Sequence, residues 1–220
     1  MLSYVLYLAR TNLFFNKMDT IAFIISIIIL IISVVIHEVS HGYTADLLGD
    51  PTPRLQGRLT LNPIKHMDLY GSVVIPLITS MLGMTFGWAK PVEWNPYNIK
   101  NRRLGEVLIS IAGPGSNLFL ALVFGLSIRF LQETLPHSML SIFSYIVIIN
   151  IVLCIFNLIP IPPLDGSKVL FNLLPYSMNR YRAILENNQI ITIFIVLFVL
   201  WPVFEPLIPF LFTLITGIKI

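Results

Sequence analysis

The stretch I-A-F-I-I-S-I-I-I-L-I-I-S-V-V-I-H-E-V-S-H, residues 21–41, begins as an almost uninterrupted apolar run and ends in three ionisable side chains. About 20 apolar residues in an α-helix are enough to cross a bilayer, so this run predicts a membrane-spanning helix, which we expect over residues 20–48. Ionisable groups near the centre of such a helix cost about 2.5–3.5 kcal/mol each and usually mark functional sites. His37, Glu38 and His41 are therefore candidate functional residues.

The composition of the whole chain indicates the same environment. Of its 220 residues, 56% are hydrophobic and 11% are charged, whereas soluble domains are about 25% charged. The net charge of +3 is spread over short connections. We therefore expect no nucleic-acid partner, and contacts with the lipid bilayer instead. The single cysteine, Cys154, excludes an internal disulfide. The chain is predicted to be a multi-pass protein of the cell membrane.

Further apolar stretches predict further helices. Gly49-Asp50-Pro51 should end the first helix, because glycine and proline both terminate helices. We expect helices over residues 104–131 and 138–159, and a short helix over 167–174 after the sequence I-P-I-P-P-L-D-G. The stretch 190–218 is apolar but is interrupted by prolines. It should form either two short spans or one broken hairpin.

The remaining segments complete the expected fold. Residues 1–19 predict a short interfacial helix, and residues 87–96 (G-W-A-K-P-V-E-W-N-P) predict a short surface hairpin or a loop at the membrane surface. The result is an all-α polytopic membrane protein with five or six transmembrane helices. We expect three units, namely the N-terminal interfacial segment 1–19, a membrane-embedded core over 20–175, and a C-terminal membrane hairpin over 176–220.

Basic residues predict the orientation of the chain. Residues 90–103 contain four Lys or Arg and residues 165–189 contain three, whereas residues 132–138 contain none. Cytoplasmic connections are enriched in Lys and Arg, so the first two should be cytoplasmic and the third should lie outside. A metal site shared between the first helix and residues near 165 would then lie toward the cytoplasmic side. The apolar stretch 72–86 has both flanks in the cytoplasm, which predicts a re-entrant segment.

The motif H-E-V-S-H at residues 37–41 has the spacing of a zinc site. Side chains four positions apart lie on one face of a helix, so His37 and His41 could bind the same zinc ion. Glu38 would then act as the general base on a water molecule that the metal activates. This motif within a hydrophobic helix predicts a zinc hydrolase whose active site lies in the membrane.

A catalytic zinc site usually has three protein ligands, so the motif lacks one. His137 lies in the connection expected outside, across the membrane from the motif. His66 is nearer in sequence and could reach the site. Asp165 is the stronger candidate, because it follows a helix broken by prolines and Gly166 permits a tight turn there. Spacing alone does not separate a metal ligand from an ordinary turn aspartate at this position.

Three motifs together resemble those of one protein family. They are H-E-V-S-H (37–41), G-P-G-S-N (113–117) and N-L-I-P-I-P-P-L-D-G (157–166). Their kinds, order and placement in membrane segments resemble the site-2 protease family of membrane-embedded zinc metalloproteases, peptidase family M50. The stretches 57–71 and 87–92 look like a compact prokaryotic subgroup without PDZ or CBS domains.

The resemblance implies a site for one zinc ion per chain. Its ligands would be the two histidines of the H-E-x-x-H motif, His37 and His41, and the aspartate of the D-G motif, Asp165. Glu38 would be the general base. The implied substrates are single-span membrane proteins, cleaved in or near their transmembrane segments during regulated intramembrane proteolysis.

Other polar residues are candidates for supporting roles. Asn117 and Asn157 match polar positions near the site in that family, where they would hold the substrate backbone or the oxyanion. Hydrogen bonding between helices explains the two asparagines equally well. His66 is retained as a third supporting candidate.

Two other functions are compatible with polar residues inside a membrane. An ion or proton transporter could use intramembrane His, Glu and Asp to bind or relay ions. A transporter has no need, however, of two histidines one turn apart with a glutamate between them, and the sequence shows no inverted repeat. A pseudoenzyme could keep the metal as a structural clamp, but Glu38 would then be dispensable. We therefore predict a zinc metalloendopeptidase.

Overall fold

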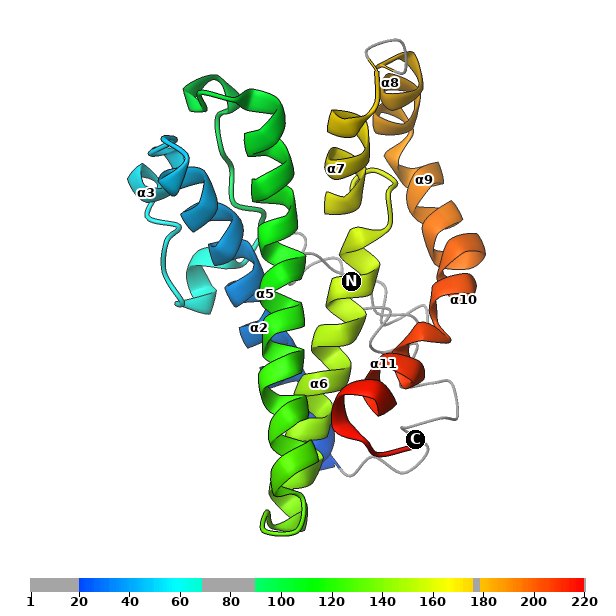
Figure 1. Cartoon of the computed structure of the whole chain (residues 1–220). Helices are drawn as coiled ribbons and strands as arrows, with labels where there is room; N and C mark the ends of the chain where they lie inside the picture. The colour runs from blue at the N-terminus through cyan, green and yellow to red at the C-terminus, as the bar shows by residue number, and fades with distance from the viewer. Residues whose placement is uncertain (1–19, 69–89, 176–178, 220) are drawn as a thin grey trace.

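The computed structural model describes residues 20–68, 90–175 and 179–219, and every regular element in these ranges is helical (Figure 1). The long helices are α2 (Thr20–Leu47), α5 (Arg102–Leu131) and α6 (His137–Leu158). The short elements are α3 (Thr52–Leu55), η1 (Pro63–His66), η3 (Pro96–Asn98), α7 (Asp165–Leu173), α8 (Asn179–Asn187), α9 (Gln189–Ile195), η5 (Val196–Leu200), α10 (Trp201–Phe204) and α11 (Leu207–Thr216). The three predicted long helices and α7 are confirmed, each to within two residues of the expected bounds.

Three helices in the described ranges are long and apolar enough to cross a membrane, namely α2, α5 and α6. A fourth crossing would come from Ile191–Phe204 and Leu207–Thr216, which are bent by 47° at the break between them. The structure therefore supports three or four spans. The interfacial helix expected over 1–19 and the re-entrant segment expected over 72–86 lie outside the described residues, so a total of five or six spans stays a prediction.

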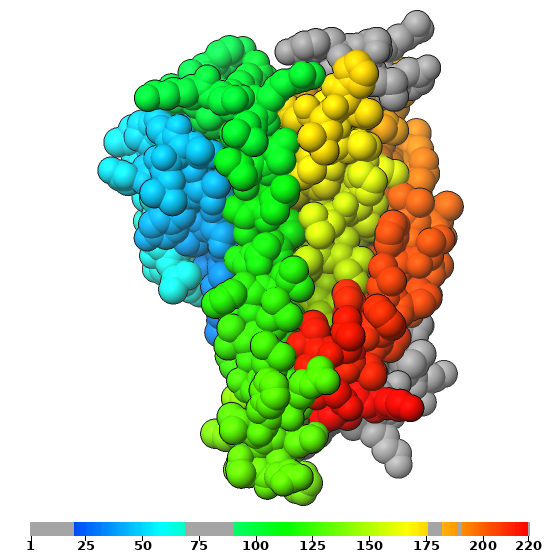
Figure 2. All heavy atoms as spheres, in the orientation of Figure 1, coloured from blue at the N-terminus to red at the C-terminus, as the bar shows by residue number. Residues whose placement is uncertain are grey.

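Helix α5 is central to the bundle. In the space-filling view it runs between α2 and α3 on one side and α6 and α7 on the other (Figure 2). The short connection 132–136 makes α5 and α6 antiparallel neighbours. It lies at one end of the molecule, whereas the N-terminus of α5, α7 and α8 lie at the other (Figure 1). Both basic connections thus occupy the same end of the bundle.

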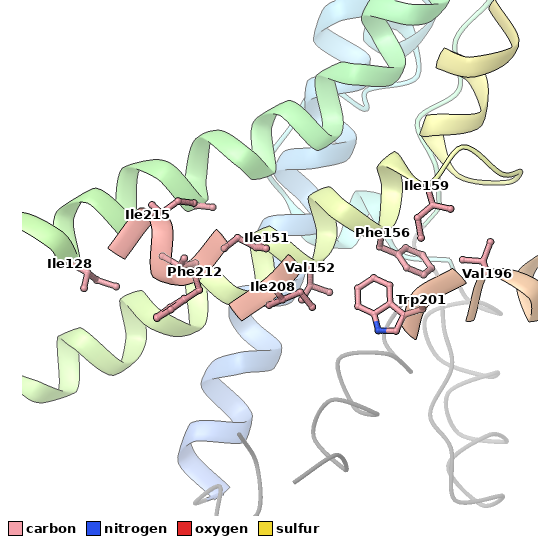
Figure 3. Close-up of a cluster of buried hydrophobic side chains, with 12 residues drawn as sticks. Ile128, Ile151, Val152, Phe156, Ile159, Val196, Trp201, Ile208, Phe212 and Ile215 are labelled. Carbon is pink, nitrogen blue, oxygen red and sulfur yellow. The ribbon is translucent and has the colours of Figure 1, made fainter. Parts of the chain in front are cut away.

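Buried apolar side chains join the C-terminal helices to α5 and α6 (Figure 3). Trp201 of α10 lies against Phe156 of α6 with ring centroids 5.7 Å apart, and Phe212 of α11 is 1% exposed. A smaller cluster joins α2 to α6 through Leu30 and Leu153. Lipid is as apolar as these side chains, so such clusters stabilise a membrane protein mainly through close packing.

The loop that follows α2 is organised by Asp50, whose side chain is buried. Its Oδ1 accepts hydrogen bonds from the backbone N–H and the hydroxyl of Thr52 at 3.1 and 2.6 Å, and from Nδ2 of Asn98 at 2.7 Å. Its Oδ2 accepts from the N–H of Asn95 at 2.5 Å. The start of α3 is thereby tied to the segment 90–95. That segment is irregular, and the described part of the chain contains no strand. Of the two forms expected over 87–96, the described residues 90–95 therefore show the loop and not the hairpin.

Candidate metal centre

Helix α2 places two histidines on the side that meets α5 and α7. His37 and His41 are 3% and 7% exposed, and their Nε2 atoms lie 3.0 Å apart. Oδ2 of Asp165 lies 3.2 Å from Nε2 of His37 and 3.1 Å from Nε2 of His41. Within the described ranges, these three residues form the one group of His, Cys, Asp or Glu whose ligand atoms are close enough to hold a metal ion. The structure therefore brings together three residues that are far apart in the sequence.

The spacing of these three atoms fits a zinc ion. Zinc binds histidine nitrogen at about 2.0–2.1 Å and carboxylate oxygen at about 2.0–2.2 Å, usually with tetrahedral geometry. Two ligand atoms of such a tetrahedron lie about 3.4 Å apart. The observed separations of 3.0–3.2 Å are slightly shorter. A small outward movement of the three side chains is enough to admit the ion.

Hydrogen bonds on the far side of each ring decide which nitrogen faces the centre. Nδ1 of His41 lies 2.6 Å from the carbonyl oxygen of Ile109, which can only accept, so this Nδ1 carries the proton. Nδ1 of His37 lies 2.6 Å from Oδ1 of Asn117 and donates to it. Both Nε2 atoms then present lone pairs to the centre, which is the form in which imidazole binds a metal.

Asp165 reaches the centre from the first residue of α7. An acidic side chain in the first turn is favoured by the helix dipole, and Nζ of Lys168 lies 3.7 Å from its Oδ1. The prediction that Gly166 serves a tight turn is wrong, because this residue lies inside α7 and has no positive φ. A Cβ at this position would lie 2.2 Å from the carbonyl oxygen of Leu158. Glycine is needed there so that α7 can pack against the end of α6.

Gly113 of α5 was not predicted as part of the site. A Cβ at Gly113 would lie 2.4 Å from Nε2 of His41 and 2.6 Å from Nε2 of His37. The hydrogen atom of glycine therefore lets α5 approach the two metal-facing nitrogens directly. The sequence contained a signal for this, because Gly113 and Asn117 are four positions apart on α5 and so share a helix face.

Glu38 lies beside His37 on α2 and is partly buried. Its Oε2 accepts a hydrogen bond from the backbone N–H of Val92 at 2.9 Å. Val92 is itself 6% exposed and belongs to the segment that Asp50 holds against the end of α2. The candidate base is therefore oriented by a backbone group of the loop.

The structure separates the remaining sequence candidates. Asn117 contacts His37, as described above. Asn157 is buried, but its Nδ2 donates to a backbone carbonyl of its own helix at 2.8 Å. His66 is 2% exposed, its Nε2 pairs with a backbone carbonyl of its own loop at 2.8 Å, and it is not part of the metal-binding group. His137 is exposed at the start of α6, at the opposite end of the bundle (Figure 1).

Comparison with known proteins identifies the family. Peptidase family M50 matches residues 25–134 and 126–202. The chain belongs to peptidase family M50. It is 41% identical over 191 residues to a Bacillus subtilis protein named "Putative zinc metalloprotease YwhC", and the match covers 80% of this chain and 84% of that protein.

Relatives of lower identity carry a similar description. A Mycobacterium tuberculosis protein named "Putative zinc metalloprotease Rip2" is 27% identical over 78% of this chain and 65% of its own length. The Mycolicibacterium smegmatis protein of the same name is 32% identical over 64% of this chain and 53% of its own length. The match thus spans less than two thirds of each Rip2 protein. No solved structure matches the chain at a significant level.

Membership of family M50 establishes the chemical class of the protein. It is a zinc metalloendopeptidase, and its apolar helices make it a multi-pass membrane protein. The group formed by His37, His41 and Asp165 could bind the zinc ion.

Proposed function

We propose that the protein hydrolyses peptide bonds in or near the transmembrane segments of single-span membrane proteins, as in regulated intramembrane proteolysis. In this proposal His37, His41 and Asp165 hold one zinc ion and Glu38 is the general base. One observation carries the proposal. Three candidate ligand atoms converge within 3.2 Å of one another, and two of them come from a helix long and apolar enough to span a membrane.

The residues around the centre have separate tasks in this reaction. Zinc, when bound, supplies an activated water nucleophile and polarises the scissile carbonyl. Glu38 takes a proton from the attacking water and delivers it to the leaving amine. The N–H of Val92 holds Oε2 of Glu38 at 2.9 Å, so we assign the proton transfer to Oε1. The bonds from His37 to Asn117 and from His41 to Ile109 keep both imidazoles in the ligand tautomer.

A helical substrate must unwind locally, because its scissile carbonyl is otherwise engaged in the helix. We propose that the unwound segment adds as a strand to exposed backbone in 57–62 or 87–94. The N–H groups of Lys90 and Val92 already bond to the carbonyl of His66 and to Glu38. Pairing with the described part of 87–94 would therefore have to use other backbone groups, or displace these bonds.

The placement in the membrane follows from charge. We propose that the end of the bundle that carries the basic connections 90–103 and 165–189 faces the cytoplasm, with the active site toward that side. The complete chain would have five or six spans, with a re-entrant segment over 72–86. Its organisation would comprise an interfacial segment, a catalytic core ending near residue 175 and a C-terminal membrane hairpin.

Two polar residues are assigned supporting roles. Asn117 would orient His37, because its Oδ1 lies 2.6 Å from Nδ1 of that ligand. Asn157, which is 7% exposed, would interact with the substrate backbone or the oxyanion from the end of α6. His66 would act indirectly, by stabilising the loop that its ring holds through Thr60.

The four histidines of the chain provide the test of the metal site. Zinc per chain should be measured by elemental analysis on purified protein after single changes to alanine. His37→Ala, His41→Ala and Asp165→Ala should each reduce zinc well below one per chain and abolish cleavage of a single-span substrate. His137→Ala is the control at the far end of the bundle and should leave both values unchanged.

His66→Ala separates a third imidazole ligand from a loop residue. Retention of about one zinc ion per chain is the expected result, since His66 is outside the metal-binding group. Loss of zinc in His66→Ala with retention in Asp165→Ala would overturn the proposed ligand set. Absence of zinc from well-folded wild type would overturn the metal site as a whole.

A further inference from the structure

A second asparagine is hydrogen-bonded to Asn117. Asn150 of α6 is 0% exposed, and its Oδ1 accepts from Nδ2 of Asn117 at 2.9 Å. Nδ2 of Asn150 donates to the carbonyl oxygen of Ile146 at 2.9 Å and to Oγ of Ser33 at 3.0 Å. Ser33 is 2% exposed and lies one turn before His37 on α2. A buried chain of hydrogen bonds therefore connects α2, α5 and α6 and ends at a candidate zinc ligand.

The direction of every bond in this chain is fixed by its starting point. The carbonyl oxygen of Ile146 can only accept, so the amide nitrogen of Asn150 must face it. Oδ1 of Asn150 then faces Asn117 and requires an N–H there. Asn117 must consequently present its own Oδ1 to His37. Because that oxygen only accepts, His37 carries its proton on Nδ1 and keeps Nε2 available.

We propose that Asn150, anchored by Ser33, is a positioning residue that sets the amide orientation of Asn117 and thereby the tautomer of His37; this inference rests on the proposed role of His37 as a zinc ligand. Rotation of the Asn117 amide by half a turn would present N–H groups to His37. Nδ1 of His37 would then accept, its proton would move to Nε2, and the nitrogen that faces Asp165 would be blocked.

The two histidines differ in their need for such a residue. Nδ1 of His41 donates to the backbone carbonyl of Ile109, whose direction is fixed by the helix. Nδ1 of His37 instead faces a side-chain amide, whose nitrogen and oxygen can exchange places. Because Asn117 is buried, a wrongly turned amide would be costly, since no bulk water is available to hydrogen-bond to it. Nδ2 of Asn117 also donates to the backbone carbonyl of Ser33, but that bond is long, at 3.4 Å. The 2.9 Å bond to Asn150 is therefore the stronger of the two interactions that orient the Asn117 amide toward His37.

The first test is the zinc affinity of Asn150→Leu, which replaces the amide by an apolar group of similar size. Affinity should be measured by chelator competition on purified protein, which does not depend on cleavage. Loss of a group that orients a metal-binding histidine typically weakens binding about 10- to 100-fold, and we expect a change in this range. Ser144→Ala is the matched control. Its hydroxyl bonds to the carbonyl of Leu140 on the same helix, apart from the chain of bonds to His37, so zinc affinity should be unchanged.

The same change made in an Asn117→Asp variant distinguishes an effect on the orientation of the Asn117 amide from a general effect on helix packing. In Asn117→Asp both carboxylate oxygens accept, so either orientation gives His37 the acceptor that it needs. Adding Asn150→Leu to this background should change zinc affinity by less than about 3-fold, because the two changes act through the same bond. An equal loss of affinity in both backgrounds, or no loss in the wild-type background, would overturn the proposal.

The outcome for Asn150 is separable from the outcome for the metal site. Wild-type protein that binds no zinc contradicts the proposed function itself, whereas zinc binding that is insensitive to Asn150→Leu contradicts this inference alone. If Asn150→Leu does not fold, Asn150→Ala decides in its place, because it also removes the amide that bonds to Asn117 but introduces no branched side chain that could clash with its neighbours. A loss of zinc affinity that disappears in the Asn117→Asp background supports the proposal. No loss, or the same loss in both backgrounds, refutes it.

Discussion

Gly113→Ala gives the sharpest prediction on the packing of the metal centre. The added Cβ would lie 2.4 Å from Nε2 of His41 and 2.6 Å from Nε2 of His37, which is about 1 Å short of the 3.4 Å at which ordinary contacts begin. Helix α5 or the two imidazoles must move to relieve this overlap, and overpacking of this kind costs about 1–3 kcal/mol. Both contacts are with the nitrogens that we propose as zinc ligands, so we expect the cost to fall on zinc binding, as a loss of affinity of about 10- to 100-fold.

The same motif contains the control. In G-P-G-S-N, Gly115 is two positions further along α5, is exposed, and its added Cβ would meet no atom within 4 Å in the described part of the structure. Gly115→Ala replaces glycine by a better helix former and should leave zinc affinity unchanged. Zinc affinity by chelator competition and thermal unfolding should be measured for both variants. Gly113→Ala that binds zinc as tightly as Gly115→Ala would refute the close approach of α5 to the imidazoles.

The loop and the charge pattern give four further predictions. Val92→Pro removes the N–H that holds Glu38 and should lower the cleavage rate while zinc content stays unchanged; an unchanged rate would count against the assigned role of this bond. Asp50→Ala should destabilise the loop by about 1–3 kcal/mol, seen as faster proteolysis between residues 51 and 99. Burial acts to raise the pKa of Asp50, but four hydrogen bonds hold that pKa below its usual value. Wild-type protection should therefore be complete above about pH 4 and should decline as the pH falls toward the lower folded-state pKa; protection that rises on acidification would refute this. Single cysteines can be placed at the exposed positions Lys100 and Glu133, and native Cys154 should give little background because it is buried. A membrane-impermeant thiol reagent should label position 100 from the cytoplasmic side and position 133 from the outer side. Labelling of both from one side would contradict the orientation.

The long helices could be predicted closely because their signal is strong and local. A helix that crosses lipid is mostly apolar, so the start of α2 and the ends of α5 and α6 are visible as the edges of apolar runs. The end of α2 was predicted instead from Gly49-Asp50-Pro51, because glycine and proline terminate helices. The bent pair at the C-terminal end was left as two alternatives, since prolines locate a break and do not determine its angle. The loop after α2 was harder to predict, because its shape depends on the bonds that Asp50 makes to residues more than 40 positions away.

Part of the candidate site could also be predicted, where its signal is local in the sequence. His37 and His41 are recognised by their spacing on one helix, but the approach of Asp165 depends on how α7 packs, and its assignment as a ligand required the family resemblance. Asn150 was missed because a mostly apolar helix conceals which face meets which neighbour, and the G-P-G-S-N motif did not show that Gly113 would contact the two histidines. A polar amide within the run I-I-N-I-V was nevertheless a signal, since such groups in lipid-exposed helices are costly and need partners.

We propose that Glu38 is the general base of this zinc metalloendopeptidase. The most direct measurement compares wild type and Glu38→Gln in lipid vesicles that contain a single-span substrate, with zinc content determined on the same samples. Wild type should cleave the substrate, whereas Glu38→Gln should not, although it retains about one zinc ion per chain. Cleavage by zinc-loaded Glu38→Gln at the wild-type rate would contradict the account.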